Sequence, residues 1–169
     1  MARRNTALFG YGASFSSKAK KPAPASVESL PAPVVRVGAD VDVLMTGVGG
    51  TGVVTVSQVL GTAAMLDGLH VRGLDQTGLS QKAGPVVSDL RLSRTEPTPS
   101  NRATASSVDV LVAFDQLVAG ADGTMRVADH ERTLMVLNTA EVPTGSMVVH
   151  PDRSFPAHEL DERLGARGR

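Results

Sequence analysis

The stretch "MTGVGGTGVVT", residues 45–55, constrains the fold more than any other part of the chain. Gly47, Gly49 and Gly52 satisfy the pattern G-x-G-x-x-G, with an apolar run before it and a helix-like pattern after it. In this context Gly47 is expected to permit a tight turn, Gly49 the close approach of another group, and Gly52 the packing of the helix on the strand. The free N–H groups of the first helical turn then predict a site for a phosphate or another anion.

The segments around this turn predict a strand–helix–strand unit. Residues 41–47 are a short apolar run bounded by turn signals, which is typical of a buried parallel strand. Residues 51–68 predict a helix that ends at Gly68. Its buried face is expected to contain five apolar residues at helical spacing: Val53, Val56, Leu60, Ala63 and Ala64. A second strand is expected over residues 69–75, which makes a βαβ unit with a right-handed crossover.

The remaining patterns extend this unit into an α/β domain. Residues 85–93 alternate apolar and polar side chains, and residues 108–115 and 133–139 each predict a strand. Residues 155–165 predict a closing helix. Val, Leu and Ala dominate the apolar content, as in parallel strands covered by helices. We therefore predict a Rossmann-like three-layer domain with a mostly parallel sheet over residues 40–165.

The first 38 residues predict a flexible arm or linker rather than a packed element. They are rich in Pro and Ala, and no acidic residue precedes Glu28, a pattern that superficially resembles an organellar transit peptide. Up to Asp40 the chain has six Lys/Arg against two Asp/Glu, a net charge of +4; the remainder has eleven against fifteen, a net charge of −4. The acidic balance of the folded part argues against a nucleic-acid-binding surface there.

Composition and spacing also exclude several kinds of chemistry in this chain. It has no cysteine, so it offers no thiolate for an iron–sulfur cluster and no cysteine nucleophile, and this composition favours a cytoplasmic protein. No apolar run approaches the length of a membrane span. Neither a metal site nor a serine hydrolase is predicted, because four scattered histidines and two serines lack the required spacings: His70, His130, His150, His158, Ser57 and Ser80. We identify no catalytic residue.

The residues around the glycine turn leave two interpretations open. Asp75, at the end of the second predicted strand, lies where a dinucleotide-binding fold places its ribose-binding acid. The alternative is a glycine turn retained only for close packing. Asp115 ends a later predicted strand and is expected either to face a ligand or to cap the following helix, and Asn138 and Thr139 present the same choice.

A longer set of ordered motifs resembles one known family. The glycine turn runs Gly47-Val48-Gly49-Gly50-Thr51-Gly52, and "DQTGLSQKAGPVVSDLRLS" follows at residues 75–93. Further on come "VDVLVAFDQLVA" and "VLNTAEVPTG". Together these motifs, over roughly residues 40–165, resemble the gamma domain of 2-oxoacid:ferredoxin oxidoreductases. Within that group the greatest similarity is to the C-terminal part of bacterial indolepyruvate ferredoxin oxidoreductase.

This resemblance implies a supporting role in a larger enzyme. Enzymes of this family oxidatively decarboxylate 2-oxoacids with thiamine diphosphate and magnesium, and pass electrons through iron–sulfur clusters to ferredoxin and the acyl group to coenzyme A. The chain has neither cysteines nor a G-D-G…N thiamine motif, so those cofactors are expected on other domains or subunits. The chain alone is then expected to be inactive. Its partners would be the thiamine- and cluster-bearing parts of the enzyme and, through them, ferredoxin.

The same resemblance implies which residues dock or bind. The set is Gly47, Gly49, Gly50, Thr51, Gly52, Thr77, Gly78, Gln81 and Lys82. The turn would receive a partner loop or an anionic part of coenzyme A, and Lys82 could bind that anion or be a solvated loop lysine. Ala83 and Pro85 replace the Gly-rich pair of the family, and its further C-terminal helix is missing. These departures predict a truncated domain, and the alternatives are a free-standing nucleotide-binding module or a non-functional gene fragment.

Overall fold

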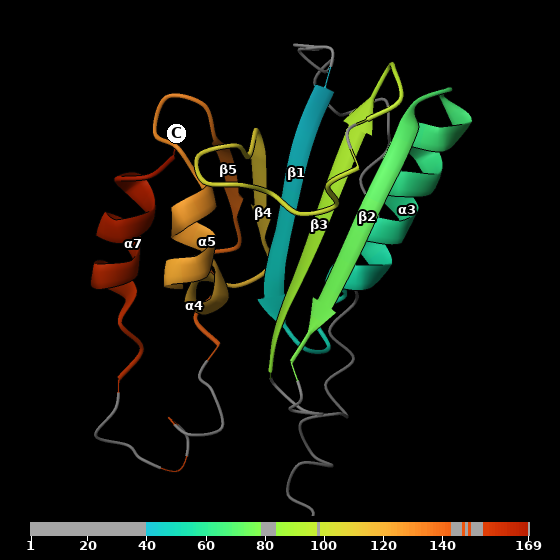
Figure 1. Ribbon diagram of the computed structural model, residues 1–169. Helices are drawn as coiled ribbons and strands as arrows, with labels where there is room; N and C mark the ends of the chain where they lie inside the picture. Colours follow the sequence, from blue (N-terminus) through green and yellow to red (C-terminus); the bar gives the residue numbers. More distant parts are fainter. Residues whose placement is uncertain are drawn as a thin grey trace, which may run out of the picture. The chain divides into compact units, whose positions relative to one another are not determined.

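A five-stranded sheet forms the centre of the described part of the chain, with strand order β2-β3-β1-β4-β5 (Figure 1). The computed structural model describes residues 40–78, 84–97, 99–142, 147, 149 and 154–168, which all belong to one unit, Val37–Arg169. The strands are β1 (Asp40–Val48), β2 (His70–Thr77), β3 (Pro85–Ser93), β4 (Val110–Ala113) and β5 (Leu134–Leu137). The predicted arm, residues 1–38, lies outside the described residues.

The sheet is mixed. β4 pairs in parallel with β1 and β5, whereas β3 is antiparallel to both β1 and β2. Four strands therefore run in one direction, and β3 runs against them between the two strands of the predicted βαβ unit. The reason is the short connection from β2 to β3, residues 78–84, because a parallel neighbour needs a crossover of about a dozen residues or more. The α/β class is confirmed, and β3 is the departure from a parallel sheet.

Helices cover both faces of this sheet. α3 (Val53–Leu66) packs on β1, β2 and β3, and its Val53 shares a buried cluster with Val43 and Met45 of β1. Leu44, whose side chain points to the opposite face, shares a second cluster with the other helices. These are α4 (Gln116–Ala119), α5 (Asp122–Val127) and α7 (Ala157–Gly165), which gather at the β4–β5 side in Figure 1. The predicted three layers are confirmed.

The buried face of α3 differs from the one predicted. Val56 and Leu60 are 42% and 36% exposed, and the buried residues are Val53, Ser57, Gly61 and Ala64. A Cβ on Gly61 would lie 3.4 Å from Val71 Cγ1 and 3.5 Å from Leu90 Cδ1, so the small residues let the helix lie close to the sheet. The helix therefore buries the face that can approach the sheet most closely, and not the face with the most large apolar residues.

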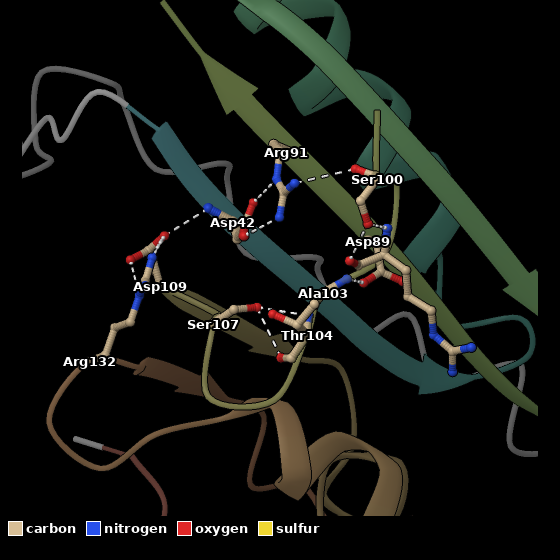
Figure 2. A network of polar contacts seen from close by, with 10 residues as sticks. Asp42, Asp89, Arg91, Ser100, Ala103, Thr104, Ser107, Asp109 and Arg132 are labelled. Carbon is tan, nitrogen blue, oxygen red and sulfur yellow. Dashed lines mark hydrogen bonds and ion pairs between the residues drawn. The ribbon is translucent and has the colours of Figure 1, made fainter. Parts of the chain in front are cut away.

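Two arginine–carboxylate pairs fasten neighbouring strands at the amino end of β1 (Figure 2). Arg91 of β3 donates two hydrogen bonds to Asp42 of β1, at 2.5 Å and 2.7 Å. Arg132, before β5, donates to both oxygens of Asp109 at 2.8 Å and 3.1 Å, and Asp109 also accepts from the Asp42 N–H at 2.8 Å. The carboxylates raise the pKa of both guanidinium groups. This network, at the end of β1 away from the glycine turn, is structural because every charge in it is paired.

Candidate functional site at the glycine turn

The glycine turn joins the carboxyl end of β1 to the first residue of α3. Gly49, Gly50 and Thr51 are exposed, and Gly52 is half-buried. The Thr51 hydroxyl donates to the Val48 carbonyl at 2.7 Å, and the Thr51 N–H approaches the same oxygen at 3.1 Å. The turn is therefore a closed, exposed loop at the edge of the sheet.

The pattern predicts that Gly47 permits the tight turn and that Gly52 allows close packing, but in the structure each glycine has the role predicted for the other. Gly47 belongs to β1, and a Cβ there would lie 2.6 Å from Thr51 Oγ1, 2.8 Å from Val53 Cγ2 and 2.9 Å from Phe114 Cβ. Gly52 has a φ of +91°, and a Cβ there would meet nothing within 4 Å. Gly47 thus provides the close packing, whereas Gly52, like Gly50 at φ +97°, is required for its backbone conformation.

The second predicted segment meets the turn at the same edge of the sheet. The Gly49 N–H donates to the carbonyl of Gly84 at 2.8 Å, immediately before β3. The Gly78 N–H donates to the carbonyl of Pro85 at 3.2 Å, which holds the end of β2 beside the start of β3. Gln81 and Lys82 fall between these anchors and lie outside the described residues. Thr77 and Gly78 are exposed near the turn, so the structure brings two distant motifs together.

The amino end of α3 presents unpaired N–H groups at this turn. Its first residues cannot donate within the helix, Gly52 provides no side-chain cap, and the first turn contains no acidic residue. Among the described residues no acceptor faces the N–H groups of Val53, Val54 or Thr55. The aligned peptide dipoles add a partial positive charge, so this end of the helix favours an anion.

Two buried oxygen atoms lie near the carboxyl ends of β1 and β4. Thr46 is fully buried and Asp115 is 5% exposed, and neither Thr46 Oγ1 nor Asp115 Oδ2 has a partner among the described residues. The other oxygen of Asp115 accepts from the Val118 N–H at 2.9 Å, so Asp115 caps α4. Asn138 donates to the Phe114 carbonyl at 3.0 Å and accepts from the Ala140 N–H at 3.1 Å. Asp115 and Asn138 thus hold the β4 and β5 ends of this edge in place.

Other candidates from the sequence are not brought into the site. β2 continues past Asp75 to Thr77, and β3 separates Asp75 from β1. His70, His130 and His158 are exposed and far apart in the chain, and His150 lies outside the described residues. Across the described residues no group of three His, Asp or Glu residues could hold a metal ion. The helices of that same part of the chain include none that is long and apolar enough to cross a membrane.

The sequence analysis missed an apolar face on the α3 side of β4 and β5. Val110 and Val112 are half-buried there beside Leu134 and Val136, which are 49% and 52% exposed. We call these four residues the β5 apolar face. α3 packs on β1–β3 instead, and its own exposed side chains include Val59 and Leu66. The alternation of side chains within β4 and β5 was the available signal for this face. The sequence does not show whether a helix covers the face, because that depends on the position of α3.

Comparison with known proteins agrees with this fold. The family model described as pyruvate ferredoxin/flavodoxin oxidoreductase matches residues 42–166. The chain is 27% identical over 133 residues to the indolepyruvate oxidoreductase subunit IorB of Methanothermobacter thermautotrophicus, covering 74% of this chain and 63% of that protein. The IorB subunit of Archaeoglobus fulgidus is 30% identical over 128 residues, which cover 73% and 57% of the two chains. The chain thus spans about three-fifths of the length of these archaeal relatives.

Solved structures share the fold at lower sequence identity. Pyruvate oxidoreductase subunit PORC of Thermotoga maritima superposes with a TM-score of 0.51 at 16% identity, covering 78% of this chain and 60% of that one. The 2-oxoglutarate:ferredoxin oxidoreductase of Magnetococcus marinus gives a TM-score of 0.52 at 16% identity, covering 64% of this chain and 18% of that one. Since the family model covers most of the described domain, the chain belongs to the pyruvate ferredoxin/flavodoxin oxidoreductase family.

Proposed function

We propose that this chain is the gamma-type domain of an indolepyruvate or related 2-oxoacid:ferredoxin oxidoreductase, with residues 40–165 as the domain and residues 1–38 as a linker. The parent enzyme oxidatively decarboxylates a 2-oxoacid to an acyl-coenzyme A and passes the electrons to ferredoxin. Thiamine diphosphate, magnesium and iron–sulfur clusters belong to partner domains. The likeness to IorB subunits supports the indolepyruvate assignment. We also propose that the domain corresponds to the C-terminal part of a bacterial indolepyruvate ferredoxin oxidoreductase and that the enzyme is cytoplasmic.

The uncapped amino end of α3 is the observation that carries the site assignment. This helix end lies beside the exposed glycine turn, and the first turn of α3 contains no acidic residue. A phosphate of coenzyme A therefore fits the charge and the exposure of the helix end. The solved relative from Magnetococcus marinus was determined with coenzyme A bound. A partner loop that donates a carboxylate or a carbonyl group to the same N–H groups is the second occupant consistent with this geometry.

A charge placed at the helix end tests this assignment. Thr55 is exposed in the first turn of α3, and Thr62 is exposed further along the same helix. Thr55→Glu should weaken coenzyme A binding at least about tenfold in calorimetric titration, because a carboxylate occupies the positive end of the helix. Thr62→Glu is the matched control and should bind as the parent does. Pantetheine, which has no phosphate, should not bind; equal binding of pantetheine and coenzyme A would refute the phosphate site.

The β5 apolar face supports docking onto the catalytic partners. Exposed Leu134 and Val136 lie beside half-buried Val110 and Val112, and such an apolar area on a soluble domain marks an interaction surface. We assign the thiamine-bearing domain of the same enzyme as its occupant. Contact there would cover the sheet face that α3 leaves open.

A free-standing nucleotide-binding module is the competing function, and the position of β3 disfavours it. In a dinucleotide fold the ribose-binding acid follows the strand next to β1, whereas Asp75 lies on a strand two positions away, about 10 Å at ordinary strand spacing. Calorimetric titration with NAD and FAD separates the two functions. Micromolar affinity for either nucleotide would favour the competing function.

A further inference from the structure

A cavity lies on the sheet face opposite α3. Its volume is about 180 Å³, and its walls come from β1, β2, β3, the segment before β4, and the α4–α5 pair. The floor is aliphatic, with Leu44, Val87, Val118 and Val127 among its residues. This volume fits a ring or a branched chain of about ten heavy atoms, because an apolar cavity of about 150 Å³ already holds benzene.

Two arginines line this aliphatic floor. Arg102 and Arg126 are exposed residues of the lining, and neither forms an ion pair with any described residue. The positive charge of Arg102 acts to lower the pKa of the Asp89 carboxyl, without an ion pair between the two side chains. Unpaired guanidinium groups beside an apolar pocket select an anionic head on an apolar body, and their planar fork matches a carboxylate.

A carboxyl group in the same lining limits the charge of that head. Asp89 is 6% exposed and accepts hydrogen bonds from the Ala103 N–H at 2.9 Å and from Gln76 Nε2 at 3.1 Å. Figure 2 shows Asp89 directed at Ala103, so the carboxyl is fixed by the segment that precedes β4. When it is ionised, this carboxyl group repels a dianion, such as a phosphate monoester, more strongly than a monoanion.

We propose that this cavity binds a small monocarboxylate with an aryl or branched-alkyl body, held by Arg102 and Arg126 over the aliphatic floor. The proposal is independent of the glycine turn and of the docking surface. It assigns to the domain a binding site of its own, separate from the thiamine and cluster chemistry of its partners.

Nuclear magnetic resonance titration of the full chain tests the site with three probes: phenylacetate, its neutral analogue phenethyl alcohol, and phenyl phosphate. Phenylacetate should shift the methyl signals of Val87 and Val127, with a dissociation constant on the order of millimolar for about ten heavy atoms. The neutral alcohol and the dianion should each bind at least about tenfold more weakly. Absence of phenylacetate binding, or equal affinity for the alcohol, overturns the proposal.

Matched variants separate the site from a general charge effect. Arg126→Gln should weaken phenylacetate at least about tenfold, whereas Arg94→Gln removes the same charge from an exposed residue outside the lining and should change nothing. Asp89→Asn should strengthen phenyl phosphate relative to phenylacetate. Equal losses in the Arg126 and Arg94 variants would show that net charge alone governs binding and would refute the site. Unchanged folding is read from the amide spectrum of each variant.

Discussion

Gly47 and Gly52 show how one glycine pattern contains two different physical requirements. A Cβ on Gly47 would lie within 3 Å of three side-chain atoms, whereas Gly52 is limited only by its positive φ. A packing requirement and a backbone requirement respond differently to substitution. The pattern alone could not assign them, because both residues are simply glycine in the sequence.

Gly47→Ala should therefore lower the free energy of unfolding by about 1–3 kcal/mol, as for an overpacked site. Gly52→Ala should cost about 1–2 kcal/mol through left-handed backbone strain alone. Gly68→Ala is the matched control for Gly52, because it has a φ of +78° at the other end of α3 and equally open space around its Cβ. Urea unfolding measures all three. A cost for Gly52→Ala well above that of Gly68→Ala would contradict the assignment.

Asp89 gives the protein a pH dependence that a single substitution exposes. Burial raises the pKa of Asp89 above its usual value of 3.8, although hydrogen bonds from Ala103 and Gln76 act in the opposite direction. The folded state therefore favours the protonated carboxyl. This stabilisation is fully present below the unfolded value and is lost as the pH rises through the raised value.

The consequence is that the difference in free energy of unfolding between Asp89→Asn and the parent should change with pH. Asparagine remains neutral, so the free energy of unfolding of the variant relative to that of the parent should improve from pH 3.5 to pH 7. Urea unfolding of both proteins at several pH values measures the difference, in which the other titrating groups cancel. A difference that stays constant over this range would show that Asp89 does not carry the effect.

At the scale of the elements, α3 combines a weak helix start with a close contact to the sheet. Gly52 and the residues after it leave the helix amino end uncapped. Ser57 is buried, and Gly61 lies against Val71 of β2 and Leu90 of β3. An element held mainly by packing can retain an unfavourable terminus. This arrangement is consistent with a helix end kept open for a ligand or a partner.

Thr55→Glu should consequently stabilise the isolated domain while it weakens coenzyme A binding. A carboxylate in the first turn interacts favourably with the helix dipole, by about 0.3–1 kcal/mol at low ionic strength. Thr62→Glu introduces the same side chain at mid-helix and should gain less. Thermal unfolding at low and high salt separates them, because the gain at Thr55 should shrink as salt is added. A destabilised Thr55→Glu would mean that the amino end of α3 is already satisfied.

The same scale shows what the sequence could predict. The strands, α3 and α7 followed from alternation, apolar runs and glycine stops, since these are local signals, whereas α4 and α5 had no predicted range. The cap by Asp115 was one of the two roles that its position allowed. The insertion of β3 between β1 and β2 was missed, although the short connection 78–84 contained the signal. The buried face of α3 and the roles of Gly47 and Gly52 depend on contacts with residues distant in sequence. No local pattern reports such contacts.

At the scale of the whole molecule, no helix of the described residues covers the β4–β5 half of the sheet face on which α3 packs. α3 covers the β1–β3 half, and the β5 apolar face lies beyond it on the same side. Assembly would stabilise such a domain most if a partner buried the exposed apolar side chains of this half. The exposed surface and the family membership are both consistent with the proposed role of a supporting domain.

Val136→Lys should weaken association with the thiamine-bearing partner by at least about tenfold while the fold is kept, because Val136 is 52% exposed. Val142→Lys is the matched control, since Val142 is 61% exposed but lies outside the β5 apolar face. Analytical ultracentrifugation of each variant with the partner measures the association. Equal association of the parent and the Val136 variant would exclude this face as the docking surface.

The most direct test of the central claim is reconstitution of 2-oxoacid-dependent ferredoxin reduction, measured with and without this chain. The chain alone, supplied with thiamine diphosphate, magnesium and indolepyruvate, should reduce neither ferredoxin nor a dye, because it has no cysteine for a cluster. The thiamine- and cluster-bearing partners should reduce ferredoxin at full rate only when the chain is added. Reduction by the chain alone, or an equal rate from the partners without it, would contradict its role as their gamma-type domain.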